Sequence, residues 1–329
     1  MKKLINSVEA VLAESLDGFA AAHGDIVSLG EERKFVRRRS PDRDKVALIS
    51  GGGSGHEPLH AGFVGHGMLD AACPGQVFTS PTPDQMIAAA DALDSRAGVL
   101  FIVKNYEGDV MNFEMAREMC GREALSVVTD DDVAVENSLY TTGRRGVAGT
   151  LVVEKVLGAA AERGQGLKEL KELGDHVNAR TRSMGIALTS CTVPAAGKPT
   201  FQIGADEMEL GVGIHGEPGR RRVKLMSAAA IAEEMVSAIT GDLGAAANGE
   251  ALLLVNGFGG TPAMELYLMY DAARRLLEGR GVKVVRSLVG SYVTSLEMAG
   301  CSVTLSMLDE ETMGLWDDPV HTAALRWGM

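Results

Sequence analysis

The sequence predicts an α/β protein of two domains, the first built on a doubly wound, mostly parallel sheet. Short apolar runs of strand length alternate with longer segments of helical periodicity, a pattern typical of parallel sheets covered by helices. The chain has 329 residues, of which 46% are hydrophobic, and this suits about two globular cores. A strand-like run restarts the pattern at residue 185, so we place the first domain at 1–183 and the second, a smaller mixed α/β unit, at 184–329.

Elements of the first domain follow from apolar periodicity and from turn residues. Val8, Leu12, Leu16 and Phe19 recur at helical spacing. Strands are predicted where apolar, partly β-branched runs occur, and helices where a turn precedes a periodic segment. The predicted elements are, in order, helix 5–21, strand 46–50, a turn at 79–84 that leads into a helix through about 93 with Ser80 near its start, strand 98–103, a helix from Asp109 to about 120, strand 125–129, and helices at about 147–163 and 167–179.

Three consecutive aspartates, Asp130–Asp132, follow the last of these strands. Three carboxylates in a row can suggest a metal site. Adjacent residues of an extended chain point to opposite sides, however, so we favour a structural turn.

The second domain is predicted by the same criteria. Its elements are strand 185–190, an extended segment 208–214, a helix near 227–240, strand 251–256, helix 262–279, and strands 282–287 and 301–307. The Gly- and Ala-rich segment 241–249 is predicted as a surface loop, and Arg220–Arg222 as a solvated loop. We expect residues 316–321 to form a packed C-terminal segment.

Charge and cysteine content exclude several classes of protein. The net charge is −12 and no long basic patch is present, which argues against nucleic-acid binding. Glu9, Glu14 and Asp17 interrupt any apolar core of a secretion signal, and no run approaches the ~18 apolar residues of a membrane span. The 4 cysteines include no C-x-x-C pair, which indicates reduced thiols. We therefore expect a soluble cytoplasmic protein that contacts neither nucleic acid nor membrane.

The stretch 46–60, VALISGGGSGHEPLH, is the first candidate for a functional site. Its apolar run is predicted to end at Gly51, and the glycines through Gly55 allow positive φ and a close approach of backbone N–H groups to a small ligand. His56 follows them and can carry protons near neutral pH. Ligands of parallel α/β sheets bind at the carboxyl ends of strands, so this loop is a candidate site.

Familiar glycine motifs do not fit this stretch. A P-loop requires Lys and then Ser or Thr directly after its second glycine, and no lysine is near. The dinucleotide-binding motif and the nucleophile elbow both meet His56 where they require a glycine.

A zinc motif fits the letters better. His56-Glu57-Pro58-Leu59-His60 matches H-E-x-x-H, and His66 stands at the third histidine of the extended pattern. The motif requires its first two histidines on one helix, but we expect a helix to begin only at about Pro58, which leaves His56 outside it. We therefore disfavour zinc and interpret His60 and His66 as helix-surface or packing histidines.

Three loops each follow an extended apolar segment and carry one residue able to handle protons or attack carbon. They are 51–56 with His56, 104–109 with Asp109 and 215–219 with His215. A carboxylate and a histidine can together deprotonate a hydroxyl, and a second, neutral histidine can attack a carbonyl carbon. Plainer interpretations remain open: Asp109 as a helix N-cap, His215 as a structural histidine and His56 as a loop residue.

Seven segments, in this order, resemble the dihydroxyacetone kinase family, and its substrate-binding K subunit in particular. The resemblance runs from Met1 to Met329. The segments are GGGSGHEP at 51–58, PGQVFTSPTPDQ at 74–85, KNYEGDVMNFE at 104–114, DDDVAVENSLYTTGRRG at 130–146, CTVPAAGKP at 191–199, GVGIHGEPG at 211–219 and WDDPVHTAALRWG at 316–328.

The resemblance implies a two-domain α/β subunit, usually a homodimer, that binds dihydroxyacetone. It implies that His215 adds to the carbonyl of the ketone and forms a hemiaminal, and that Asp109 and His56 handle the proton of the hydroxyl that is phosphorylated. The residues implied to line the substrate are Gly53, Ser54, Gly55, Ser80 and Lys104.

The same resemblance implies that the nucleotide lies elsewhere. ADP or ATP with Mg²⁺ is expected on a separate L subunit, which a phosphotransferase-system phosphocarrier recharges in split systems, and no metal or cofactor is expected in this chain. The alternative is a regulatory relative that senses dihydroxyacetone and activates a transcription factor. The retained Asp109 and His56 favour the enzyme, and a zinc hydrolase is a distant third hypothesis.

Overall fold

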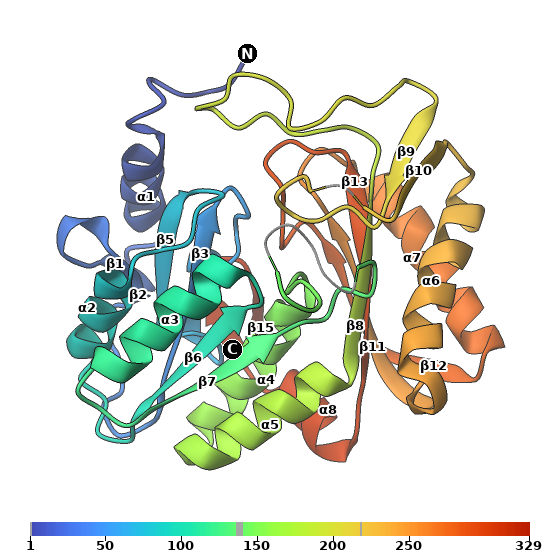
Figure 1. The fold of residues 1–329 in the computed structure, drawn as a ribbon. Helices are drawn as coiled ribbons and strands as arrows, with labels where there is room; N and C mark the ends of the chain where they lie inside the picture. The colour runs from blue at the N-terminus through green and yellow to red at the C-terminus, as the bar shows by residue number, and fades with distance from the viewer. Residues whose placement is uncertain (1, 136–140, 218) are drawn as a thin grey trace. The chain divides into compact units, whose positions relative to one another are not determined.

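The computed structural model describes residues 2–135, 141–217 and 219–329, which form two compact units (Figure 1). The first unit contains Met1–Val128, Val153–His176 and Gly314–Met329, and the second contains Thr129–Val152 and Val177–Met313. The predicted domains, 1–183 and 184–329, are continuous segments and differ from these units. The difference arises because the chain passes between the units at several points, which no local pattern in the sequence reveals.

The first unit has the predicted parallel core. Strand β3 (Ala47–Ser54) pairs in parallel with β5 (Ala71–Val77) and with β6 (Val99–Lys104). An antiparallel edge adds β1 (Val27–Leu29) and β2 (Val36–Arg38). The strand order is β1-β2-β5-β3-β6-β7, where β7 is Ala124–Thr129.

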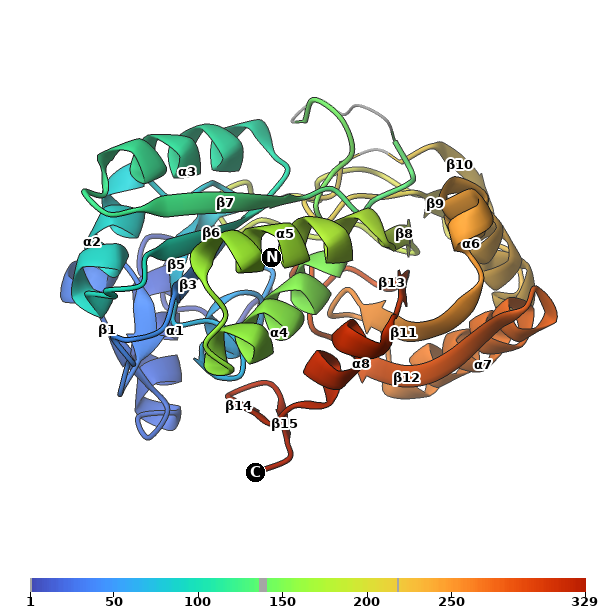
Figure 2. The same cartoon turned by 90° about the horizontal axis from the view of Figure 1, so that it is seen from below.

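Helices cover both faces of this sheet, as the prediction of a doubly wound fold requires (Figure 2). On one face, α2 (Pro83–Leu93) and α3 (Glu107–Met119) pack against alternate strand residues such as Phe101. On the other face lie α4 (Gly149–Glu162) and α5 (Leu167–Ala179). These four helices match the predicted ones to within a few residues.

Both ends of the chain belong to the first unit. Helix α1 (Val11–Ala22) begins six residues later than predicted, so Val8 lies outside it and is 37% exposed. The C-terminal segment is packed, as predicted: after α8 (Glu310–Asp317), strands β14 (Val320–Thr322) and β15 (Arg326–Trp327) form a small sheet with β4 (Gly65–His66).

The second unit is the predicted mixed α/β unit, and its sheet also has six strands. Only β11 and β12 pair in parallel, and the other pairs are antiparallel. Helices α6 (Ala228–Leu243) and α7 (Ala263–Gly279) pack their apolar side chains on it. The strand order is β10 (Arg221–Lys224), β9 (Glu207–Leu210), β8 (Thr181–Ala187), β13 (Gly300–Met307), β11 (Gly249–Gly257) and β12 (Val282–Gly290).

Two loop predictions in this unit are wrong in part. Arg221 and Arg222 begin the edge strand β10, where pairing with β9 overrides the polar composition. The segment 241–249 contains the end of α6 and a short 3-10 helix, Gly244–Ala246. In the described part of the chain, no helix combines the length and apolar character needed to cross a membrane. All four cysteines are buried and form no disulfide.

The glycines of β3 serve close packing rather than unusual backbone angles. The strand continues through Ser54 instead of ending at residue 50, and of its glycine-rich stretch only Gly55, just past the strand, has a positive φ, 103°. A Cβ on Gly51 would lie 2.5 Å from the carbonyl oxygen of Cys73, and one on Gly53 would lie 2.6 Å from the backbone nitrogen of Thr79. Most of these glycines therefore do not use the positive φ that the sequence allows, and the neighbouring backbone explains why they are glycines.

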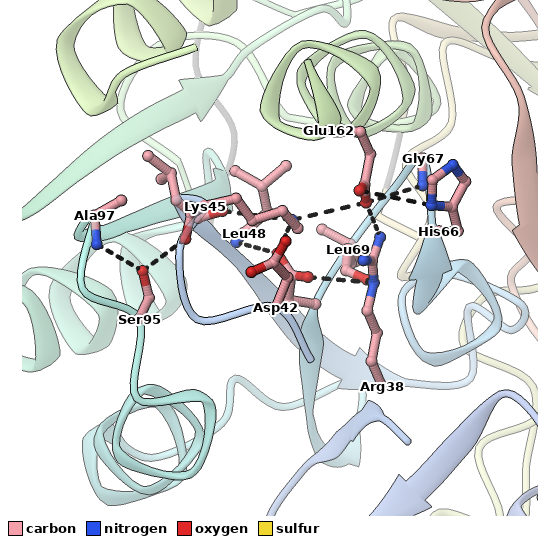
Figure 3. Close-up of polar contacts among 12 residues, drawn as sticks. Arg38, Asp42, Lys45, Leu48, His66, Gly67, Leu69, Ser95, Ala97 and Glu162 are labelled. Atoms are coloured by element: carbon pink, nitrogen blue, oxygen red, sulfur yellow. Dashed lines mark hydrogen bonds and ion pairs between the residues drawn. The ribbon is translucent and has the colours of Figure 1, made fainter. Parts of the chain in front are cut away.

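A cluster of charged side chains links the antiparallel edge of the first sheet to α4 (Figure 3). Asp70 accepts a hydrogen bond from Lys45 at 2.7 Å and lies 3.2 Å from Nε of Arg38. Arg38 also donates to Glu162 on α4, which His66 approaches at 3.5 Å. Burial alone would raise the pKa of Asp70, but the charges of Lys45 and Arg38 hold it below its usual value.

We expect Asp70→Ala to destabilise the protein by about 3 kcal/mol, because it leaves two buried cations without their shared carboxylate. The folded-state pKa of Asp70 is depressed, so its contribution is present above the unfolded value near ~3.9 and is lost as the pH falls through the folded value. Urea denaturation at neutral pH and at pH about 3 measures both effects. Asp44→Ala, at an exposed ion pair with Arg96, is the control and should change stability by less than about 1 kcal/mol. Equal losses in the two variants would contradict the prediction.

Gly53→Ala should lower the thermal midpoint, because the added Cβ overlaps the backbone of Phe78 and Thr79. Overpacking of this kind costs about 1–3 kcal/mol. Gly18 in α1 has nothing within 4 Å of an added Cβ, so Gly18→Ala should be neutral or stabilising. Calorimetry of the two variants checks the difference, and a Gly53→Ala protein as stable as Gly18→Ala would refute the packing argument.

Candidate functional site

Lys104 is the centre of the candidate site in the first unit. It is the last residue of β6, and its side chain is fully buried. The ammonium donates to the carbonyl oxygen of Gly51 at 3.2 Å and lies 3.5 Å from Oδ2 of Asp109. A Cβ on Gly52 would lie 2.1 Å from Nζ, so glycine at 52 makes room for the charge.

Asp109 lies at the amino end of α3. The helix begins at Glu107 and its N-cap is Tyr106, so Asp109 occupies the first turn instead of heading the helix as predicted. The N-cap alternative is therefore wrong. The carboxylate is 3% exposed, and the helix dipole together with Lys104 compensates its charge. Ser80 lies beside the same turn, because a Cβ on Gly108 would lie 2.8 Å from its Oγ.

His56 lies just beyond the end of β3 and is 1% exposed. Its ring stacks on Phe78, with centroids 5.0 Å apart and an angle of 16° between the planes. A Cβ on Gly53 would in turn lie 2.8 Å from the backbone of Phe78. Ser54 donates to the carbonyl oxygen of Gly75 at 2.7 Å.

The structure thus brings five predicted site residues together at the carboxyl ends of β3 and β6. They belong to one unit and are linked by the contacts just described; the five are Gly53, His56, Ser80, Lys104 and Asp109. Ser54 and Gly55 belong to the same strand end, where the N–H of Gly55 donates to Glu57 at 2.9 Å. Burial raises the pKa of Glu57.

His60 is the residue of this site that the sequence analysis missed. It was interpreted as a surface or packing histidine; at 5% exposure it is not on the surface, and besides packing it has three polar neighbours. Nε2 lies 2.9 Å from Nζ of Lys104, and Nδ1 lies 2.5 Å from Oε1 of Glu154 and 3.0 Å from Oγ of Ser50. Glu154 stands on α4, 94 residues away, and no local pattern signals that pairing. Burial raises the pKa of Glu154 to about 8.

A metal site at these histidines gains no support. The helix expected from Pro58 does not form, and residues 61–63 make only a short 3-10 helix. Among the described residues, no group of three His, Cys, Asp or Glu side chains could hold a metal ion.

His215 lies in the second unit, in the loop after β9. Its Nδ1 is 3.1 Å from Oε1 of Glu217, and its backbone N–H donates to Oε2 at 3.0 Å. Burial acts to raise the pKa of Glu217, but the charge and hydrogen bond of His215 and the charge of Arg145 outweigh it and lower the pKa to about 2. Glu217 is therefore an ionised carboxylate, and because a carboxylate only accepts, Nδ1 of His215 donates to it and the ring is held in a fixed orientation.

The aspartates before this loop have the predicted structural role. Asp131 accepts hydrogen bonds from the backbone of Val147 and Gly149 at 2.8 and 2.7 Å, where α4 begins. Asp132 pairs with the fully buried Arg145 at 2.7 Å, and Arg145 also donates to the carbonyl oxygen of Gly211. Asp131 thus holds the backbone where α4 begins, and Asp132 holds the arginine that contacts the start of the His215 loop.

The chain is similar to several known proteins over nearly its whole length. A subunit from Listeria innocua named "PTS-dependent dihydroxyacetone kinase 1, dihydroxyacetone-binding subunit DhaK" is 50% identical over 331 residues, which cover 98% of this chain and 100% of that protein. Among solved structures, the dihydroxyacetone kinase of C. freundii matches with a TM-score of 0.90 and 32% identity, over 99% of this chain and 60% of that one. A second structure, titled "Dihydroxyacetone kinase operon co-activator Dha-DhaQ", matches with a TM-score of 0.88 and 35% identity, over 94% of this chain and 97% of that one.

The family model of the Dak1 domain matches residues 17–324, which is nearly the whole chain. The Listeria innocua subunit covers 98% of the chain at 50% identity, and the C. freundii kinase covers 99% at 32% identity. The chain belongs to the Dak1 domain family.

Proposed function

We propose that this protein is the dihydroxyacetone-binding subunit of a dihydroxyacetone kinase, an enzyme that transfers a phosphoryl group to an alcohol. The observation that carries the proposal is the full-length match to a subunit of that name at 50% identity. The geometry agrees, because an oriented histidine and a buried carboxylate beside a lysine suit carbonyl capture and proton removal.

His215 supplies the covalent anchor in this proposal. Its Nε2 bonds to the carbonyl carbon of the ketone, and the π electrons move to the oxygen, which takes up a proton from water. Nδ1 releases its proton past Glu217 to water, so one proton moves net from the ring to the oxygen. The product is a neutral hemiaminal that contains every atom of the ketone. Glycerol has no carbonyl carbon to attack, so the same chemistry discriminates against it.

Asp109 and His56 act on the hydroxyl that is phosphorylated. Asp109 is the general base, and His56 is its partner in handling the proton. Lys104, Ser80 and the strand end at Gly53, Ser54 and Gly55 line the substrate in this proposal. What supports it is the gathering of these residues around the ends of two parallel strands.

The phosphoryl donor is proposed to lie outside this chain. ADP or ATP with Mg²⁺ is held by a separate L subunit, which a phosphotransferase-system phosphocarrier recharges. We further propose a cytoplasmic homodimer. The edge position of β12 and the exposed side chains of Met264, Tyr267 and Leu268 on α7 support a protein interface on the second unit.

A second candidate function is a dihydroxyacetone-sensing co-activator of a transcriptional regulator. The similarity to the co-activator structure favours it. The buried pair of Lys104 and Asp109 favours the enzyme, because sensing alone does not require a base at a hydroxyl. Transfer of phosphate to dihydroxyacetone by the purified protein with an L subunit separates the two.

We expect His215→Ala to abolish the covalent adduct. Intact-protein mass is measured after incubation with dihydroxyacetone and, separately, with glycerol. The native protein should gain the mass of one ketone without loss of water and should gain nothing with glycerol. His176→Ala, at a histidine on α5 remote in sequence from the loop, is the control and should keep the adduct. A ketone-sized gain in His215→Ala would rule out this nucleophile.

We expect Asp109→Asn to keep the adduct and to lose phosphoryl transfer by about 10²–10⁴-fold, the usual contribution of a general base. The adduct is followed by mass and the transfer rate by formation of dihydroxyacetone phosphate with an L subunit. Turnover near that of the native protein would refute the assignment of Asp109 as the base.

A further inference from the structure

The ammonium of Lys104 makes its shortest contact to His60, and its ion pair with Asp109 is longer. Nζ lies 2.9 Å from Nε2 of His60 and 3.2 Å from the carbonyl oxygen of Gly51, both within hydrogen-bond range. Oδ2 of Asp109 is farther away, at 3.5 Å. The buried ammonium of Lys104 therefore has three partners among the described residues, and the nearest is the neutral ring of His60.

The direction of that hydrogen bond fixes the tautomer of His60. An ammonium only donates, so Nε2 must accept and the ring hydrogen must be on Nδ1. Burial and the charges of Lys104 and His56 lower the pKa of His60 well below its ordinary value, which keeps the ring neutral. A protonated ring would place two donors against each other at Nε2.

Glu154 and Ser50 complete the arrangement on the other side of the ring. Oε1 of Glu154 is 2.5 Å from Nδ1, and Oγ of Ser50 is 3.0 Å from it. The Ser50 hydroxyl donates to the carbonyl oxygen of Ile102 at 2.7 Å, so its oxygen is available as an acceptor. Oε2 of Glu154 has no hydrogen-bond partner among the described residues, whereas Oε1 contacts the ring of His60.

We propose that His60, oriented by Glu154, is a positioning residue that holds the ammonium of Lys104 back from Asp109, so that Asp109 keeps its capacity to take the substrate proton. The inference rests on the proposed role of Asp109 as the base. A direct ion pair with an ammonium favours the charged form of a carboxylate and makes it a weaker base. The acceptor at Nε2 of His60 competes for the ammonium and prevents that collapse.

Two amide substitutions separate this role from a purely structural one. The amide of Gln reaches the place of Nε2, so His60→Gln retains an acceptor for Lys104. The amide of Asn reaches only the place of Nδ1, so His60→Asn retains a partner for Glu154 and Ser50 and loses the one for Lys104. The two variants have the same functional group and differ in which contact they preserve.

The titratable groups around the ammonium are His60 and His56 near the end of β3, Asp109 of α3 and Glu154 of α4. We expect His60→Gln to retain transfer close to that of the native protein. We expect His60→Asn to lower kcat by about tenfold to a hundredfold, a part of what a general base contributes, with a smaller change in KM. In the His60→Asn variant, the acidic limb of the pH–rate profile should move to lower pH, because the ammonium of Lys104 then pairs more closely with Asp109.

The control and the competing outcomes are defined by the structure. His66→Gln alters another contact between a histidine and a glutamate of α4, that of His66 with Glu162, and should leave the rate and the pH profile unchanged. A larger loss in His60→Gln than in His60→Asn, or equal losses with an unshifted profile, would overturn the inference. Adduct mass at His215 should persist in all these variants. If the native protein itself transfers no phosphate, the proposed function fails, and the transfer comparison is not made.

A second measurement needs no variant and stands whether or not the proposed function does. In the native protein labelled with ¹⁵N-histidine, the NMR shifts of His60 should show a protonated Nδ1 and an unprotonated Nε2 between pH 6 and 8. A proton on Nε2 would overturn the inference even if His60→Asn failed to fold.

Discussion

A charged ammonium buried at the end of a parallel strand is the constraint on which the candidate site depends. Lys104 is fully buried, and removing a charge from water is costly unless acceptors surround it. Its described acceptors are the backbone of Gly51, the ring of His60 and the carboxylate of Asp109. Each belongs to a different piece of local structure, so the charge can be buried only where these pieces meet.

That requirement accounts for much of the first unit. The backbone of β3 must pass beside Lys104, and glycine at 52 leaves the space for Nζ. Helix α3 must begin at Glu107 for Asp109 to lie in its first turn, and α4 must present Glu154 to the ring of His60. Helices from both faces of the sheet therefore converge on the polar side chains at the end of β6. The doubly wound architecture supplies such a meeting point at the carboxyl ends of its strands.

The sequence predicts this fold well because its signals are local. Strands at 98–103 and 301–307 and the helices after Pro83 and Pro262 are confirmed because apolar runs and turn residues specify them within a few positions. The extension of β3 through its glycines was not predicted, since glycine composition also suits a loop, and only the neighbouring Cys73 and Thr79 show why the strand continues. Division of the chain between two units was beyond prediction for the same reason, because it depends on packing between distant segments.

The same difference between local signals and long-range packing decides which candidate site residues the sequence predicts. His56, Asp109 and His215 carry recognisable chemistry beside strand ends, so the sequence identifies them as candidates. Glu217 stands two residues from His215, yet its role appears only when the loop brings its carboxylate to Nδ1 and a buried Arg145 keeps it ionised. Glu154 is a single acidic residue in an apolar helix, and its partner is 94 positions away.

Capture of a ketone and removal of a proton make different demands on the protein. In the proposed function, capture needs a neutral imidazole with its lone pair on the attacking nitrogen, and the ionised Glu217 orients the ring by accepting a hydrogen bond from Nδ1. Proton removal needs a carboxylate that is buried, charged and still basic. This combination is harder to maintain, because a neighbouring cation stabilises the buried carboxylate but also makes that carboxylate a weaker base. A relative that only senses the ketone could lose the arrangement of His60 and Glu154 behind Lys104 while Lys104 still lined the substrate. Its full retention here, with a buried glutamate whose pKa is raised to about 8 and whose second oxygen has no hydrogen-bond partner among the described residues, is a cost in stability that binding alone does not explain. The polar core of the first unit therefore favours the proposed enzyme over the proposed sensor.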